Sequence, residues 1–265
     1  MIGLFSIMAV AFILGMRHAT DPDHVIAVST IVSRQPKLSR AALIGAFWGL
    51  GHTFTIFVVG TAIILFNLTI PARVGLSMEL SVGLMLILLG ALNVVSFFRA
   101  VPTAPMDSGE NAHSHHHSHG DYIHRHVHTH EPEAHPHAPD QTPVAFLDRL
   151  LGTSGLYQHI RPLAIGIVHG LAGSAAVALL VLATIRNPRW AIAYLLVFGV
   201  GTIAGMMVIT MSLASAIKVV GRSQKVSRRL AMASGLLSLA FGCLVVYQIG
   251  FVNGLFSGHP LWTPR

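Results

Sequence analysis

Charged side chains are scarce in this sequence. Of its 265 residues only 10% are Asp, Glu, Lys or Arg, whereas 53% are hydrophobic and the mean hydropathy is +0.66. Soluble domains carry about 25% charged residues, so this composition excludes an ordinary soluble protein and predicts a protein embedded in the lipid bilayer. Cysteine is almost absent as well. The single Cys243 excludes an internal disulfide and leaves the redox compartment undetermined.

Sequence signals of several other protein classes are missing. No nucleotide-binding P-loop pattern occurs, so direct ATP coupling within this chain has no support. Residues 1–16 are apolar from the start and lack a basic leading region, so we expect no signal peptide. A net charge of +7 would suggest a nucleic-acid partner in a soluble protein. Here the basic residues lie between apolar stretches, so membrane topology explains them and we expect no nucleic-acid partner.

Six apolar segments reach the length of about 20 residues that a bilayer requires. The first is unusually long and contains Pro22, which lacks a backbone donor and therefore predicts a break. We predict an all-α membrane protein with six transmembrane helices, the first of them broken near Pro22. The predicted segments are Ile2–Val32, Ala41–Phe66, Leu76–Phe98, Ile160–Ile185, Trp190–Val219 and Leu230–Phe256.

Lysine and arginine are distributed unequally between the two sides of these segments. The first, third and fifth loops hold twelve basic residues within them or at their edges, and the opposite side holds four. Cytoplasmic loops are generally richer in Lys and Arg. The sequence therefore predicts that these three loops are cytoplasmic and that both termini lie outside.

The two halves of the chain resemble each other. Gly15–His18 is matched 151 residues later by Gly166–His169, and two further glycine patterns recur at offsets of 150 and 152 residues. Two three-helix units in tandem insert with opposite orientations, as in many secondary transporters. We therefore predict two inverted three-helix repeats, residues 1–100 and 146–265, separated by residues 101–145. Chance similarity between glycine-rich helices is the alternative.

Five ionisable side chains interrupt the first apolar segment, within Arg17-His18-Ala19-Thr20-Asp21-Pro22-Asp23-His24. Such side chains at bilayer depth are costly and indicate a functional site. Two His and two Asp form a nitrogen and oxygen ligand set that suits a divalent transition metal. In a regular helix His18, Asp21 and His24 share one face. A break there can turn Asp23 inward as well, whereas an extracytoplasmic loop with solvated charges is the alternative.

Further histidines lie inside the predicted helices. His52 can join the ligands if Gly49 and Gly51 let the second helix approach the first. The alternative is a hydrogen-bonded core residue, which is the usual role of a lone buried histidine. We predict a metal site formed by His18, Asp21, Asp23, His24 and His52. The residues placed around these ligands or along the path of the ion are Arg17, Thr53, His169 and Ser174.

The segment between the two halves is rich in proline, polar residues and histidine. Such a composition cannot bury a core, so we predict that residues 101–145 form a disordered cytoplasmic loop. Histidine-rich tracts usually bind metal through neutral imidazole nitrogens, and a passive linker is the alternative. The candidate auxiliary ligands are His113, His115, His116, His117, His119, His124, His126, His128, His130, His135 and His137.

The pattern His18-(x)₄-Asp23-His24, followed by Gly51-His52 in the next helix, resembles the signature of the nickel/cobalt transporter family, NiCoT or NicO-like. The resemblance covers the first three helices well and the second half loosely. It implies a multi-pass carrier of Ni²⁺ or Co²⁺ in a bacterial inner membrane, with His18, Asp23 and His24 needed for transport. Typical members have eight spans, and a later family motif with Asp, Thr and Glu is replaced here by residues 170–176. The six-span layout is also similar to the efflux branch and to urease-accessory membrane proteins.

Three classes of function are compatible with these residues. The first is a secondary carrier of Ni²⁺ or Co²⁺, with Zn²⁺ as a further candidate, no other cofactor and no enzymatic activity. The second is a membrane metalloenzyme, because His18-(x)₄-Asp23 is also the spacing of some acyltransferase sites, where the aspartate orients a histidine base. The third is an efflux protein, or a metal sensor or chaperone whose partners mature a nickel enzyme such as urease or hydrogenase.

Overall fold

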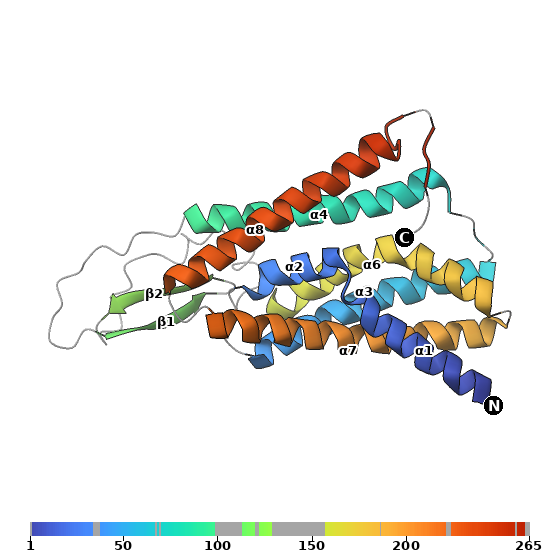
Figure 1. Cartoon of the computed structure of the whole chain (residues 1–265), viewed down its shortest axis with the longest axis horizontal. Coiled ribbons are helices and arrows are strands. Elements are labelled where there is room, and N and C mark those ends of the chain that lie inside the picture. The colour runs from blue at the N-terminus through green and yellow to red at the C-terminus, as the bar shows by residue number, and fades with distance from the viewer. Residues whose placement is uncertain are drawn as a thin grey trace.

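The computed structural model is built mainly of long helices that run roughly along one axis (Figure 1). Within the described residues lie seven α-helices, one π-helix and two short strands. The structure describes residues 2–33, 38–66, 68, 70–98, 113–119, 122–128, 157–185, 187–220, 224–257 and 259–262.

The helices lie where the sequence predicts them, and the first predicted segment is divided in two. One helix ends at His18 and the next begins at Pro22, so the predicted break is present. The helical elements are α1 (Ile2–His18), α2 (Pro22–Val32), α3 (Leu38–Phe66), α4 (Ala72–Phe98), α6 (Tyr157–Thr184), α7 (Pro188–Val220), α8 (Gln224–Tyr247) and the π-helix η3 (Gln248–Val252).

Several helices have the length and composition of membrane spans. Four stretches within the described residues qualify: Leu38–Phe66, Ala72–Val95, Pro188–Val220 and Arg229–Val252. The 29 residues of α3 correspond to about 43 Å at 1.5 Å per residue, which exceeds the roughly 30 Å of the hydrocarbon core. α1, α2 and part of α6 are shorter apolar helices. The chain is therefore a helical, multi-pass membrane protein, as its composition predicts.

Helices from the two halves of the chain alternate in the packing. The most extensive contacts are α3 with α6, α3 with α7, α4 with α8 and α1 with α7. Figure 1 shows α4 and α8 running side by side, apart from the group formed by α1, α3, α6 and α7, with α2 near the middle of the molecule. The short helix α2 contacts α4, α7 and α8. Each close pair thus joins one helix of the first half to one helix of the second.

Glycines permit the closest of these contacts. A Cβ atom added at Gly51 of α3 would clash with the carbonyl oxygen of Leu163 in α6. A Cβ atom at Gly166 of α6 would clash with the carbonyl oxygen of Trp48 in α3. Small residues let helix backbones approach closely inside a membrane, where apolar burial drives little association. This close approach places His52 of α3 beside α6.

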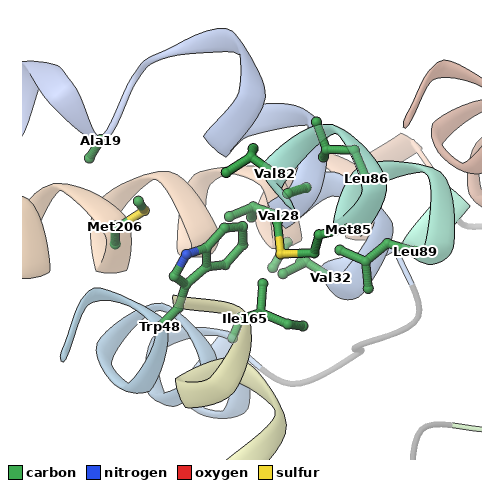
Figure 2. Packing of buried hydrophobic residues seen from close by; sticks show 13 residues of the cluster. Ala19, Val28, Val32, Trp48, Val82, Met85, Leu86, Leu89, Ile165 and Met206 are labelled. Atoms are coloured by element: carbon green, nitrogen blue, oxygen red, sulfur yellow. The ribbon is translucent and has the colours of Figure 1, made fainter. Parts of the chain in front are cut away.

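A buried apolar cluster joins α2 and α4 to the main helix group. Trp48 is fully buried, and Figure 2 shows its indole among Val28 of α2, Met85 of α4 and Ile165 of α6. Met206 of α7 belongs to the same cluster and is also fully buried. Because these side chains fill the space around α2, the cluster fixes the position of the helix that follows the break.

The segment between the two halves contains a β-hairpin, where the sequence predicts disorder. Strands β1 (His113–His119) and β2 (Tyr122–His128) are antiparallel. The other residues of 101–145, including His130, His135 and His137, lie outside the described residues. The register of the hairpin brings three pairs of histidines to opposite positions, His113 with His128, His115 with His126 and His117 with His124.

Candidate metal centre

The break between α1 and α2 is a tight turn that places ionisable side chains inside the helix group. The amide of Thr20 donates to the carbonyl of Arg17 at 2.8 Å, and the amide of Asp21 donates to the carbonyl of His18 at 3.1 Å. Asp21 occupies the N-cap position of α2, and Pro22 follows in the first turn, where its missing N–H leaves no helical hydrogen bond unmade. The chain therefore continues as a helix in a new direction, with His24 buried in its first turn.

His18 lies between a carboxylate and a second imidazole. Its Nδ1 atom is 2.7 Å from Oδ2 of Asp21, and its Nε2 atom is 3.0 Å from Nε2 of His52. The side chain of Asp21 makes no capping bond to the backbone of α2. An Asp21 carboxylate that accepts from Nδ1 leaves the Nε2 lone pair of a neutral His18 directed toward His52. Asp21 thus orients His18 from the side of the ring that faces away from His52.

Asp23 lies between two further imidazoles. Its Oδ1 atom accepts from the backbone amide of His24 at 3.0 Å and is 3.2 Å from Nδ1 of the same residue. Its Oδ2 atom is 2.9 Å from Nε2 of His169 in α6. The break therefore does turn Asp23 inward, and the carboxylate connects the first half of the chain to the second.

Three of the imidazoles are buried, although each has one ring nitrogen without a hydrogen-bond partner. His24, His52 and His169 are 2%, 0% and 1% exposed. Nε2 of His24, Nδ1 of His52 and Nδ1 of His169 are buried without a hydrogen-bond partner. Buried polar atoms are normally paired, so three unpaired ring nitrogens on neighbouring imidazoles need an explanation. The lone pair of a neutral imidazole is also the ligand that Ni²⁺, Co²⁺ and Zn²⁺ prefer.

Two overlapping groups have the geometry of a metal site. The first consists of His18, His24 and His52, and the second of Asp23, His24 and His169. Within each group the ligand atoms lie within 4.8 Å of one another. Three imidazoles, or two imidazoles with one carboxylate, form a borderline donor set without thiolate or thioether ligands. The arrangement therefore suits a divalent transition metal ion better than Cu⁺, Mg²⁺ or Ca²⁺.

Two aromatic side chains pack against the cluster. The indole of Trp48 stacks on the ring of His24 with centroids 6.4 Å apart and meets the ring of His169 edge-on at 5.8 Å. Phe198 of α7 lies 5.6 Å from the ring of His18. Packing of these rings against the imidazoles restricts the rotamers available to them.

The other residues singled out from the sequence lie around or outside this cluster. The hydroxyl of Thr53 donates to the carbonyl of Gly199 in α7 at 3.2 Å and so holds two helices together. The carbonyl of Arg17 accepts from the amide and the hydroxyl of Thr20 in the turn. Ser174 lies in α6, but its side chain is outside the described part of the structure.

Two residues lie closer to this cluster than the sequence predicts. His169 was assigned only to the surroundings of the site, because no carboxylate is near it in sequence, yet it contacts Asp23, 146 residues away. Trp48 was not selected at all. Its position four residues before His52, on the same face of α3, was the available signal. The match between Gly15–His18 and Gly166–His169 was the corresponding signal for His169.

Comparison with known proteins agrees with this geometry. The profile of the NicO family, described as high-affinity nickel-transport protein, matches residues 4–207. The chain is similar to the urease accessory protein UreH of Bacillus sp. (strain TB-90), with 34% identity over 261 residues, which cover 98% of each chain. No solved structure matched. The match includes the break, both histidines of the signature and His52, and it extends through His169. The chain therefore belongs to the NicO family of nickel-transport proteins, which are transporters and not enzymes.

Proposed function

We propose that this protein is a secondary carrier that moves Ni²⁺, with Co²⁺ as the closest competitor, across a bacterial inner membrane. The observation that carries the proposal is the buried cluster of His18, Asp23, His24, His52 and His169 at a helix break between membrane-spanning helices. An ion entering this cluster exchanges water ligands for imidazole nitrogens and a carboxylate oxygen at bilayer depth. Zn²⁺ fits the same donor set and is the second competitor to test.

We further propose that the halves are inverted repeats, and the glycine contacts support this. Gly15 of α1 meets the carbonyl of Phe198 in α7, and Gly166 of α6 meets the carbonyl of Trp48 in α3. The two glycines differ by 151 residues, and their partners differ by 150. Gly90 and Gly242 form a similar pair, in which each contacts the other's half near a glycine. A pseudo-two-fold axis that exchanges the halves predicts such paired contacts. His18 and His169 are equivalent in this arrangement, so both halves contribute to the centre.

The same contacts favour a particular movement for alternating access. Rocking one repeat against the other would separate the α1–α7, α3–α6 and α4–α8 interfaces, where glycines allow backbone contact. These close contacts therefore disfavour that movement. Fewer contacts join the α4–α8 pair to the remaining helices, and most of them involve α2 or α6. We propose that the α4–α8 pair moves as a unit relative to α1, α3, α6 and α7, and that α2 lies at the boundary between the moving parts.

The predicted topology adds to this proposal the side of the membrane on which the histidine-rich segment lies. The excess of Lys and Arg in the loops on one side supports a cytoplasmic position for the segment 101–145 and an outside position for both termini. The hairpin then presents paired histidines on the cytoplasmic side, where they would hold ions that leave or approach the membrane centre. Imidazole ligands without a fixed coordination geometry discriminate weakly among Ni²⁺, Cu²⁺, Zn²⁺ and Co²⁺.

A second function is favoured by a separate observation. The relative UreH is named a urease accessory protein, and the present chain matches it along its full length. Delivery of nickel to the maturation proteins of a metalloenzyme would give the His-rich hairpin a direct role, with the membrane helices supplying the ion. Export of excess metal uses the same centre in the opposite direction.

Flux of ⁶³Ni²⁺ into proteoliposomes tests the carrier function. We expect saturable flux with the wild-type chain, loss of flux in His18→Ala and Asp23→Asn, and unchanged flux in His259→Ala, whose imidazole is exposed near the end of the chain. Substitution of the eleven loop histidines by Asn should leave most of the flux intact. Flux equal to that of empty liposomes, or flux that depends on the loop alone, would support the accessory function instead.

A further inference from the structure

We infer that the cluster offers one ion two alternative positions that share His24, and that the ion passes from one to the other during transport. The imidazole position is formed by His18, His24 and His52. The carboxylate position is formed by Asp23, His24 and His169. The passage between them rests on the proposed carrier function, whereas the two positions themselves rest on the geometry of the cluster.

The ring of His24 lies between the two positions. Its centroid is 4.2 Å from that of His169 and 4.9 Å from those of both His18 and His52. Its Nδ1 atom lies 3.2 Å from Oδ1 of Asp23, whereas its Nε2 atom is buried and has no partner. One nitrogen of the ring therefore belongs to the carboxylate position, and the opposite nitrogen is left for the imidazole position.

The chemistry of imidazole makes the two positions alternative rather than simultaneous. A neutral imidazole carries one N–H group and one lone pair, so His24 can bind a single ion at a time. With the ion at the imidazole position, Nδ1 of His24 carries the ring proton and donates it to Asp23. With the ion at the carboxylate position, the ring proton is carried by Nε2. The number of protons on His24 is the same in both states.

The two positions differ in the charge of their ligands and in the half of the chain that supplies them. The imidazole position consists of neutral ligands from α1, α2 and α3, which all belong to the first half of the chain. The carboxylate position adds one negative charge and includes His169 from α6, in the second half. An ion that moves between them passes from one half of the chain to the other and leaves Nε2 of His24 for Nδ1 of the same ring. The proton on Nδ1 leaves to water by way of the partly exposed Asp23, and Nε2 takes up another proton from water.

Each position also contains one ligand that is open to its surroundings. The side chain of His18 is 17% exposed and that of Asp23 is 31% exposed, whereas the other three ligands are almost fully buried. We assign access to the imidazole position to His18 and access to the carboxylate position to Asp23, because each is the most exposed ligand of its group. Two entrances to one shared, buried ligand are what a carrier needs in order to load an ion on one side and release it on the other.

Cobalt binding to the purified full-length chain tests this inference. All proteins carry Asn at the eleven loop histidines, so that only the membrane centre binds. The probe is Co²⁺, whose visible d–d absorption reports on its ligands, and bound metal is counted by equilibrium dialysis and elemental analysis. The variants are His52→Ala for the imidazole position, His169→Ala for the carboxylate position and His24→Ala for both, with His259→Ala as the matched control. His52→Asn and His169→Asn replace any alanine variant that fails to elute as a folded species.

We expect one Co²⁺ per wild-type chain and none in His24→Ala. His52→Ala and His169→Ala should each keep one Co²⁺, with d–d bands that differ from each other because one site retains a carboxylate and the other does not. Two ions in the wild type would overturn the inference, and so would loss of binding in both His52→Ala and His169→Ala, since a single five-ligand site would explain it. Nickel flux separates this from the proposed function. A wild type that shows the expected binding pattern but no flux refutes the carrier function and supports the two positions. A wild type that shows flux without that binding pattern supports the carrier function and refutes the two positions.

Discussion

Asp21 is the residue whose substitution best separates a metal ligand from a residue that orients one. Its Oδ2 atom lies 2.7 Å from Nδ1 of His18, and it belongs to neither group of converging ligand atoms. In Asp21→Asn the side-chain amide can donate to Nδ1, which places the ring proton of His18 on Nε2, where it points at His52 and blocks the lone pair. Loss of a residue that orients a metal-binding histidine typically reduces metal affinity by 10- to 100-fold.

The exposure of Asp21 sets the expected magnitude. Its side chain is 47% exposed, so water screens the interaction and rotation of the Asn amide restores part of it. We therefore expect the lower end of that range, about a tenfold rise in the half-saturating Ni²⁺ concentration for flux, or about 1.4 kcal/mol. The maximal flux should stay near that of the wild type. A change below about twofold would refute the orienting role. Complete loss, as expected for Asp23→Asn, would make Asp21 a direct ligand.

Three other substitutions test the packing on which the centre depends. Gly51→Ala should force α3 away from Leu163 of α6 and lower the thermal midpoint in detergent together with nickel flux, at a cost of roughly 1–3 kcal/mol; an unchanged midpoint would contradict the close approach. Trp48→Ala removes a fully buried indole and should destabilise the fold by about 3–5 kcal/mol, whereas Trp48→Phe should keep most of the stability. A cross-link between cysteines at Asn93 and Ser234, whose side chains lie 3.3 Å apart across α4 and α8, should preserve flux in a chain with Cys243→Ser. Flux abolished by that cross-link would favour rocking of one repeat against the other.

The helices and the break could be predicted from the sequence because they depend on local properties. Apolar runs of about 20 residues, ended by basic or polar loops, mark membrane-spanning helices whatever the tertiary arrangement. Pro22 ends a helix through its own covalent structure, and the ionisable residues beside it are conspicuous in an apolar stretch. These signals predict the helical membrane fold, and they single out His18, Asp23, His24 and His52, which the structure brings together in one cluster.

Non-local contacts could not be predicted in the same way. The contact between Asp23 and His169 depends on how closely α6 approaches α3, which glycine backbones decide and which no local pattern encodes. The different roles of Asp21 and Asp23 depend on the geometry of the turn, since both carboxylates are equally plausible ligands by residue type. The hairpin in the histidine-rich segment was not predicted, because its polar composition has no apolar alternation that would mark a strand.

Anomalous diffraction at the nickel absorption edge, from crystals of the full-length chain grown with Ni²⁺, tests the central claim most directly. The ion should appear among the helices, within coordination distance of His24 and of either His52 or His169. Nickel found only in the segment 101–145, with none beside His24, would contradict a transport site at the helix break.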